Sequence, residues 1–465
     1  MKKIFIYIAI GTLAIFTACD DYVDIVPRGQ AIVESLEDVN ALLDNNNALS
    51  GARSQDNVGE LLNDNTVLLE TAQNYYATFD FFNFMNQVYN LDQVFYASHQ
   101  RDVCWTEHYN SLAVSNYICE VASTVSGNEA EKNHYLGEAK VHRVYTYWRL
   151  VNYYGVHYGH ANAGNEDSGV PLLLQFGNVE ESLKRATVNE VYEFLETELL
   201  EAIELLRENR PFVDRVNKPA AQALLARVYL HMGKYAEALK LADAALAYNS
   251  SLIDYNTLTE MVPKYDENVE HILYKEVPAP AHYDAATQSS IAALGYSESL
   301  VAAYDKPLID LRLSKLPTVN ADRIPVITDI SNGWPVGVTV PEMMLVKAEC
   351  LAQDEARINE AMEVITALRA KRFLVSAVEN GEHELTATDK QDALNKIFDE
   401  RRREFHILGM RYFDIKRLNQ QYDFVNISLT RGDVTWQPNS INWAIPIGEN
   451  TIETGRGEIK QNPRE

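Results

Sequence analysis

Hydrophobic residues recur at helical spacing along most of the chain, most clearly in residues 217–249. Apolar or small side chains mark one face of a first helix, which we expect to end at Gly233. A second helix is expected from Tyr235, with Ala238 and Ala245 on its inner face. Small residues at these places let two antiparallel helices pack closely, as in the tetratricopeptide pattern. The stretch therefore predicts a helical hairpin that stacks on its neighbours.

Helical spacing of the same kind occurs in other parts of the chain and predicts further helix pairs. The expected pairs lie near residues 102–155, 190–249, 340–372 and 392–418. They are scattered through the chain and not arranged in tandem. Such a set can still form one contiguous superhelix if the segments between the pairs lie on one side of it.

The segments between these pairs lack helical spacing and are expected to be irregular, with a few short strands such as residues 271–277. These insertions lie near residues 70–100, 155–180, 250–335 and 419–445. Nine aromatic residues occur within residues 75–96 and do not keep to one helical face. Some of these rings should therefore lie outside the main core. Asparagine, aspartate and glutamine are interleaved with them, which favours a neutral, hydroxyl-rich ligand.

The N-terminus has the features of a removable export signal. Lys2 and Lys3 precede an apolar run over residues 4–16, which is shorter than the about 20 residues that a membrane span needs. The residues around Cys19 are similar to a bacterial lipobox, in which the cysteine receives a lipid anchor. We therefore expect residues 1–18 to be removed and the remaining chain to be tethered through Cys19.

Charge and cysteine content narrow the classes of function. The formal net charge of −25 argues against a nucleic-acid partner, because phosphate binding needs clustered lysine and arginine. Cys104 and Cys119 are expected on one helix about 22 Å apart, too far for a disulfide. With Cys350 they are interpreted as buried, inert thiols, and no cysteine or histidine spacing indicates zinc.

Two clusters of polar residues could carry catalysis or bind a metal. In residues 400–418, Glu404 or Asp414 could act as acid and base, but an ion-pair network joining two helices is favoured. The two histidines of residues 157–160 lack further ligands at a suitable spacing. Phosphate-loop, GxSxG and HExxH motifs are absent from the sequence. We therefore expect no enzyme activity, no cofactor and no metal site, although the paired carboxylates of a glycosidase need not be close in sequence.

Several of these stretches together resemble the SusD/RagB family of outer-membrane lipoproteins of the Bacteroidetes. The resemblance rests on Cys19 with Asp20 and Asp21 and on residues 24–29, 105–118, 138–155, 268–277, 400–418 and 443–463. Leu408 stands where the family usually has glutamate, and Arg464 and Glu465 replace its closing Gly-Tyr. The resemblance spans nearly the whole chain, and its motifs are jointly specific.

The resemblance implies a mainly α-helical fold and a function in nutrient uptake. About four tetratricopeptide-like helix pairs would form a right-handed superhelical scaffold within a single domain over residues 19–465, and the insertions would form the ligand face. The protein would sit on the cell surface, capture an oligosaccharide and deliver it to a SusC-like TonB-dependent transporter. Asp20 and Asp21 would act as the surface-export signal. A peptide ligand, a scaffold that binds only protein segments and a surface hydrolase are the alternatives.

The ligand-binding residues are expected in the insertions, where exposed rings and amides would contact the ligand. From the first insertion we expect Tyr75, Tyr76, Phe79, Asp80, Phe82, Asn83 and Tyr89. From residues 250–335 we expect Tyr283, Tyr296 and Trp334.

Overall fold

The computed structural model describes residues 33–49, 58–80, 83–258, 267–277, 294–315, 318–319, 324–325, 334–406 and 409–465. The expected signal peptide with Cys19, Asp20 and Asp21 lies outside the described residues, as do Phe82 and Tyr283. Two adjoining side-chain cores, one large and one small, occupy the described part.

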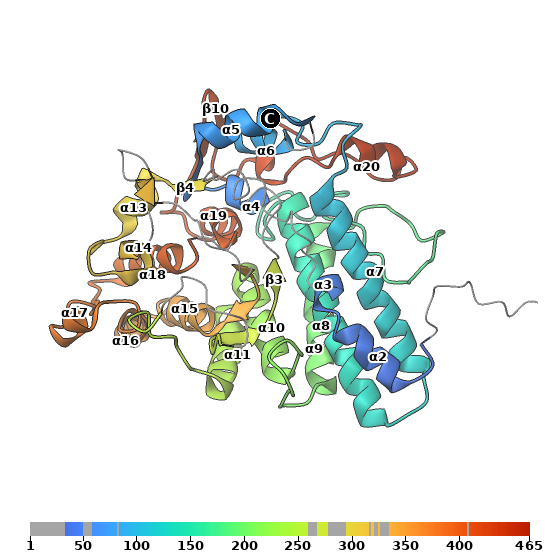
Figure 1. The fold of residues 1–465 in the computed structure, drawn as a ribbon, viewed down its shortest axis with the longest axis horizontal. Coiled ribbons are helices and arrows are strands. Elements are labelled where there is room, and N and C mark those ends of the chain that lie inside the picture. The colour runs from blue at the N-terminus through green and yellow to red at the C-terminus, as the bar shows by residue number, and fades with distance from the viewer. Residues whose placement is uncertain are drawn as a thin grey trace, which may run out of the picture.

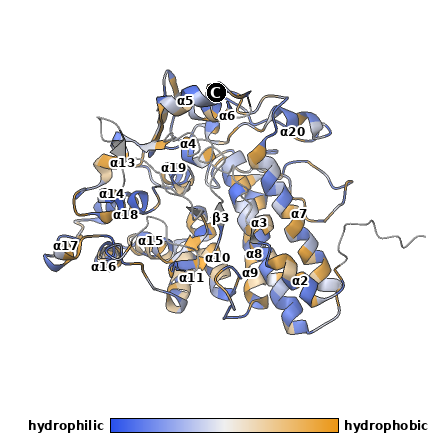
Figure 2. Cartoon of the chain, in the orientation of Figure 1, coloured by the Kyte–Doolittle hydropathy of each residue, from blue (hydrophilic) through white to orange (hydrophobic). Residues whose placement is uncertain are grey.

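The first part of the scaffold consists of three long helices, α7 (Val103–Thr124), α8 (Glu129–Tyr154) and α9 (Val188–Leu205). Each begins at a side chain that accepts a hydrogen bond from a backbone amide of the first turn: Asp102, Asn128 and Thr187. Helix α7 packs on α8, and α8 packs on α9 (Figure 1). Figure 2 shows hydrophobic and hydrophilic residues alternating along α7, as expected for a helix with one buried face.

The hairpin predicted over residues 217–249 is confirmed. Helix α10 (Lys218–Met232) starts at Asn217, whose Oδ1 accepts from the backbone amide of Ala220 at 3.1 Å. It ends at Gly233, whose φ of 72° is a left-handed conformation that favours glycine. Helix α11 (Tyr235–Tyr248) follows, with fully buried alanines against α10.

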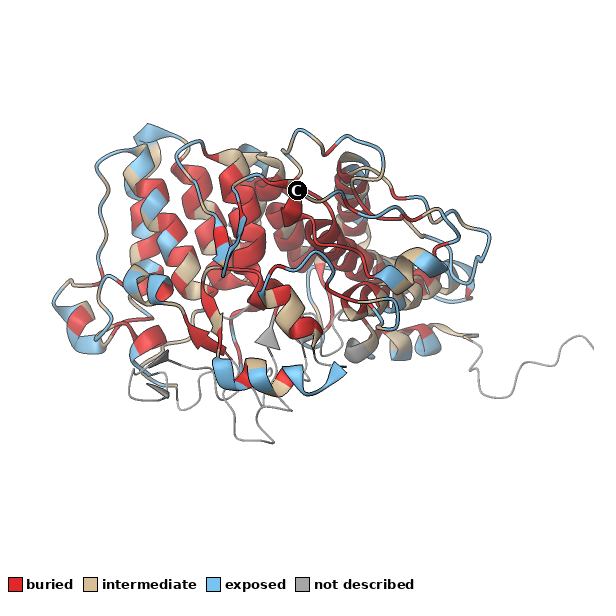
Figure 3. Cartoon of the chain, turned by 90° about the horizontal axis from the view of Figure 1, so that it is seen from above, coloured by how far each residue is buried: buried red, intermediate tan, exposed pale blue. Residues whose placement is uncertain are grey.

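The remaining scaffold helices continue this succession. Helix α11 packs on α15 (Val340–Leu351), α15 packs on α16 (Ile358–Arg369), and α18 (Lys390–Glu404) packs on both. Helix α19 (Met410–Gln421) starts after Gly409 and packs against α4 (Val58–Leu61). The predicted mainly helical, tetratricopeptide-like fold class is therefore confirmed, with buried residues concentrated in the helices (Figure 3).

The described strands are short and pair antiparallel in twos. The pairs are β1 (Thr66–Leu68) with β4 (Leu294–Tyr296), β2 (His271–Leu273) with β8 (Val338–Thr339), β3 (Glu276–Val277) with β7 (Trp334–Pro335), β5 (Thr318–Val319) with β6 (Ile324–Pro325), and β9 (Leu429–Arg431) with β10 (Val434–Trp436). The strand expected in residues 271–277 is thus present as two short pieces.

Short helices occupy the insertions and the connections between scaffold helices. They are α2 (Leu36–Leu43), α3 (Asn46–Leu49), α5 (Glu70–Ala77), α6 (Phe84–Tyr89), α13 (Glu298–Ala303), α14 (Leu311–Ser314), η2 (Glu355–Arg357), α17 (Val375–Glu379), η3 (Ile441–Trp443) and α20 (Glu449–Thr454). Helices α5 and α6 lie in the first insertion, so that segment is more regular than the sequence predicts.

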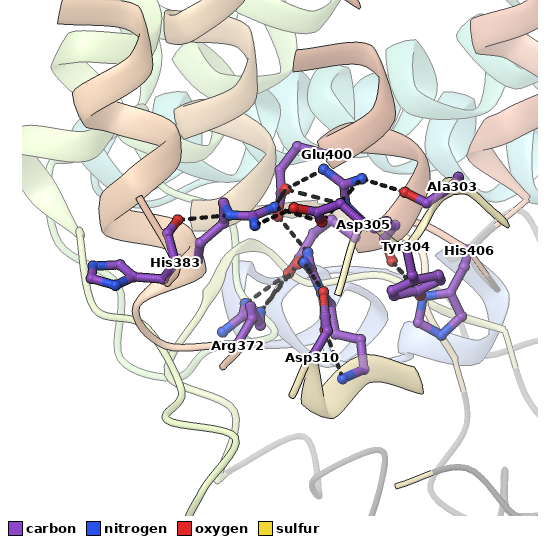
Figure 4. Close-up of polar contacts among 12 residues, drawn as sticks. Ala303, Tyr304, Asp305, Asp310, Arg372, His383, Glu400 and His406 are labelled. Carbon is purple, nitrogen blue, oxygen red and sulfur yellow. Dashed lines mark hydrogen bonds and ion pairs between the residues drawn. The ribbon is translucent and has the colours of Figure 1, made fainter. Parts of the chain in front are cut away.

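An ion-pair network explains the charged stretch at residues 400–418. The Glu400 carboxylate accepts from Arg312, Arg369 and Arg403 at 2.7–3.0 Å (Figure 4). These guanidiniums hold the pKa of Glu400 below its usual value, despite the desolvation that acts in the opposite direction. Glu404 pairs with Arg372 and Arg312. Both carboxylates therefore connect α18 to α14 through Arg312. The structural interpretation of this stretch is confirmed.

Two further ion pairs of this stretch connect its helices to each other and to the segment after α4. Asp414 accepts from the Nε of Arg401 at 2.8 Å, which joins α18 to α19. Arg411 pairs with Asp64 at 2.7 Å and not with Asp414, three residues along its own helix, because α19 packs against the segment that follows α4. Cys104 and Cys350 are buried as expected and form no disulfide among the described residues, whereas Cys119 is only half-buried.

Candidate ligand-binding face

Parts of three insertions that are far apart in sequence meet on one face of the molecule. The first insertion is joined to the third by strands β1 and β4, in which Thr66 pairs with Tyr296. The β9–β10 hairpin of the fourth insertion reaches the same place, because Arg431 donates to the backbone carbonyls of Asn63 (2.7 Å) and Thr66 (3.2 Å). Figure 1 shows α5, α6 and β10 close together, away from α10 and α11.

Four of the seven aromatic rings that the structure describes in residues 75–96 are buried beneath this face. Tyr76 is fully buried, and Phe84 and Tyr96 stack at 5.0 Å within the core. Burial of Tyr76 also raises the pKa of its hydroxyl. The prediction that Tyr76 contacts a ligand is therefore corrected: α5 turns this ring inward, where no ligand reaches it.

Two rings at the end of α5 lie on the outside of the face. Phe79 is 46 % exposed, and Tyr75 is half-buried with its ring centre 5.2 Å from that of Phe79. The two ring planes meet at 57°, so they form an angled edge and not one flat platform. A ligand could place one flat apolar surface on the Phe79 ring and a second group beside that ring.

Hydrogen-bonding side chains lie next to these rings. The Nε2 of His99 is 2.9 Å from the Oδ2 of Asp80, and both side chains are exposed. Gln100 donates to the backbone carbonyl of Asp80 at 2.8 Å, which fixes this turn. The pair leaves further donor and acceptor positions open to solvent, so it can bind a ligand with several hydroxyl groups.

The other expected residues of the first insertion are less accessible. Asn83 is half-buried before α6, and its Oδ1 lies 3.5 Å from the Nδ2 of Asn86. Tyr89 is half-buried, with the guanidinium of Arg431 4.5 Å from its ring centre. This contact occupies part of the Tyr89 ring, so Tyr89 helps to hold the hairpin in place.

The residues expected from the third insertion are distributed differently from the prediction. Tyr296 is buried, with its ring 5.2 Å from that of His406, so the prediction that it contacts a ligand is corrected. The backbone of Trp334 pairs with Val277 in the β3–β7 ladder. From the expected set, the structure therefore brings together Tyr75, Phe79, Asp80 and Asn83, whereas Tyr89 contacts Arg431.

Three residues of this face were not predicted: His99, Gln100 and Arg431. His99 and Gln100 lie about 20 residues from Asp80 in the sequence, and Arg431 lies about 350 residues from the groups that it contacts. No local sequence pattern marks any of the three. The buried surroundings of Arg431 lower the pKa of its guanidinium, whose normal value is so high that it remains charged.

The histidines of the second insertion are held by hydrogen bonds within the protein. His157 is buried, and its Nδ1 accepts from the backbone amide of Gly159 at 3.1 Å. His160 bonds to the carbonyl of Asn439 through Nε2 and accepts from Asn162 through Nδ1. Across the described residues, no group of three or more histidine, cysteine, aspartate or glutamate side chains could hold a metal ion. None of the described helices is long and apolar enough to cross a membrane.

The fold defines a class of protein: a helical-repeat scaffold whose insertions meet on one face. Residues 21–230 match a family described as starch-binding and associating with the outer membrane. Residues 340–459 match the SusD family. The two matched segments together span most of the chain, and the chain belongs to the SusD/RagB family.

Solved structures of the SusD superfamily share this fold. One from Bacteroides thetaiotaomicron is 18 % identical, with a TM-score of 0.72, covering 92 % of this chain and 100 % of its own. One from Bacteroides fragilis is 20 % identical, with a TM-score of 0.71, covering 92 % and 100 %. A SusD-like carbohydrate-binding protein from Bacteroides vulgatus is 16 % identical, with a TM-score of 0.69, covering 93 % and 99 %. A search of curated proteins gave no match.

Proposed function

We propose that this chain is a cell-surface lipoprotein that captures an oligosaccharide and delivers it to a SusC-like TonB-dependent transporter. The observation that carries the proposal is the exposed ring of Phe79 beside the Asp80–His99 pair, on a face where parts of three insertions meet. An apolar ring surface next to open hydrogen-bonding groups suits the C–H faces and hydroxyls of a sugar. Family membership and the carbohydrate-binding relative support the same class of ligand.

Binding to a panel of polysaccharides and oligosaccharides tests this function. We expect retardation of the purified protein in affinity gels that contain one class of glycan. Binding only to peptides would show that the ligand is a peptide and not a glycan. Binding to neither, together with product formation from a polymer during long incubation, would favour the hydrolase alternative.

The proposed location follows from the N-terminal sequence and has its own test. Cys19 would carry the lipid, and Asp20 and Asp21 would direct the protein to the outer face. The variant Cys19→Ala should be released from the membrane. The double variant D20A/D21A should stay anchored but lose accessibility to antibody on intact cells, and unchanged surface labelling would contradict the export role.

A further inference from the structure

A pocket of about 290 Å³ lies just after the C-terminal end of α8 and shares none of its described lining residues with the rings around Phe79. Its wall comes from residues 156–168 of the second insertion, residues 441–444 at the end of the fourth and residues 460–463 near the C-terminus. Small-molecule sites usually enclose roughly 300–1,000 Å³. The pocket therefore has room for one small ring and not for an extended chain.

Hydrogen bonds to the scaffold hold the wall of this pocket in place. The Ser168 hydroxyl donates to the carbonyl of Ala163 at 2.9 Å and accepts from the amide of Val188, the first residue of α9, at 3.1 Å. Asn462, in the C-terminal part of the wall, donates to the carbonyl of Tyr154, the last residue of α8, at 2.8 Å. A wall that is fixed in this way lowers the entropic cost of binding a ligand.

Three polar side chains of the wall keep hydrogen-bonding groups that no described residue uses. The Asp167 carboxylate accepts no hydrogen bond from any described residue, and its Oδ1 is buried. The amide of Asn165 donates to the Oδ1 of Asn162 at 3.2 Å. This contact leaves the Nδ2 of Asn162 as a donor and the Oδ1 of Asn165 as an acceptor, so the wall offers both kinds of group.

The charges around the pocket are mixed in sign. Glu166 pairs with Lys184. Arg185 gives its hydrogen bonds to carbonyl and amide oxygens, and burial lowers the pKa of its guanidinium to about 10, although the charge of Asp167 raises it. The guanidinium is therefore charged at neutral pH and offsets Asp167. An anionic ligand would meet the carboxylates of Glu166 and Asp167, and a cationic ligand would meet Arg185 and Lys460.

Hydroxyl groups fit this combination of groups best. A hydroxyl both donates and accepts, so it can serve the Asp167 carboxylate and the Asn162 amide together. An ammonium group cannot accept from Asn162, and an ionised carboxylate cannot donate to Asp167. Apolar side chains line the rest of the pocket, with Val156 and Ala444 buried and Pro463 exposed. They suit the C–H groups of a ring that carries the hydroxyls.

We propose that this pocket is a second ligand site, which binds one neutral, polyhydroxylated ring of monosaccharide size, with Asp167 as the principal hydrogen-bond acceptor. The site goes beyond the proposed function, because it encloses a single ring, whereas the edge around Phe79 is open to a longer chain. It also does not depend on delivery to a transporter.

Ligand-observed NMR of the purified full-length protein with monosaccharides tests this site. The probes are neutral hexoses and, for each of them, the uronate and the amino sugar with the same ring. We expect one neutral hexose to bind with a Kd of about 1 mM. The two charged forms of that hexose should bind at least about tenfold more weakly, because each lacks a match to one of the groups in the wall.

The test variants are Asp167→Asn and Asp167→Gly. The φ of 59° at this position is left-handed, and asparagine and glycine both tolerate it, so both variants should keep the wild-type melting temperature. D167N keeps one acceptor oxygen and should weaken hexose binding about fivefold, whereas D167G should weaken it about tenfold or more. Asp423→Asn is the matched control, because it makes the same chemical change at an exposed residue outside the pocket, and it should bind like the wild type.

The outcomes separate this site from the one around Phe79. Unchanged affinity in both Asp167 variants, tighter binding of a charged sugar, or no binding of any neutral hexose would overturn the inference. Loss of hexose binding in F79A with full binding in D167G would place the ring at Phe79, while the proposed function stands. Hexose binding that depends on Asp167, in a protein that retains no oligosaccharide of the panel, would support the pocket and overturn the proposed function.

Discussion

The guanidinium of Arg431 lies 4.5 Å from the centre of the Tyr89 ring, although more than 300 residues separate them in the chain. The same guanidinium donates to the backbone carbonyls of Asn63 and Thr66. This side chain therefore helps to fix the β9–β10 hairpin to the first insertion, together with the stacked rings of Phe95 and Trp436.

Replacement of Arg431 by alanine should loosen this face. The change removes the hydrogen-bond donor to two backbone carbonyls. Buried acceptors that lose their partner lower the free energy of unfolding by about 1–3 kcal/mol. We expect a lower free energy of unfolding in urea and a weaker affinity for the ligand. Arg431→Lys is the matched control, because lysine keeps the charge but lacks the forked donor groups of arginine. Its stability and affinity should lie between those of the wild type and R431A. Wild-type stability and affinity in R431A would contradict the role of this contact.

The buried charge network should matter far more for stability than an ion pair on the surface. Glu400→Gln removes the carboxylate that Arg312, Arg369 and Arg403 share, and breaking a buried network costs about 3–5 kcal/mol. Urea unfolding monitored by circular dichroism measures this loss.

The control for this prediction is Glu360→Gln, which breaks the exposed pair with Arg357. Water and salt screen that pair, so the free energy of unfolding should stay close to that of the wild type. Equal effects of the two substitutions would show that the network around Glu400 contributes no more than a surface pair.

Glu60 should make stability depend on pH. Burial raises the pKa of its carboxyl from 4.5 to about 8, although the Gly409 amide and the charge of Arg149 lower it. The folded protein therefore binds this proton more tightly than the unfolded chain does. The resulting stabilisation is complete below about pH 4.5 and is lost as the pH rises through about 8.

The variant Glu60→Gln tests this dependence, because it keeps a similar shape but cannot ionise. Urea unfolding at several pH values between 5 and 8 should show a smaller decline of stability with rising pH in E60Q than in the wild type. Identical slopes for the two proteins would contradict the raised pKa of Glu60.

Much of the scaffold was predictable from the sequence because its signals are local. The two ends of α10 are set by residues directly beside the helix, the N-cap Asn217 and the left-handed Gly233. The pairing within residues 400–418 was less predictable, since Arg411 pairs with Asp64, far away in sequence.

The candidate site was predictable only in outline. The aromatic stretch marked an insertion that carries an exposed ring, but it did not show that Tyr76 points inward and Phe79 outward. That choice depends on how α5 packs on segments from other parts of the chain. The contact of Asp80 with His99 is equally invisible in the local sequence, because it depends on the fold of the intervening turn.

The central claim, that the edge around Phe79 binds an oligosaccharide, is tested most directly by isothermal titration with the glycan selected from the panel. Phe79→Ala should weaken the affinity about five- to tenfold, which corresponds to about 1–1.4 kcal/mol, because the substitution would remove the exposed ring that we propose to stack on the sugar. Phe212→Ala, which removes another exposed ring, should bind like the wild type. Unchanged affinity in F79A, with both variants folded as the wild type, would contradict the account.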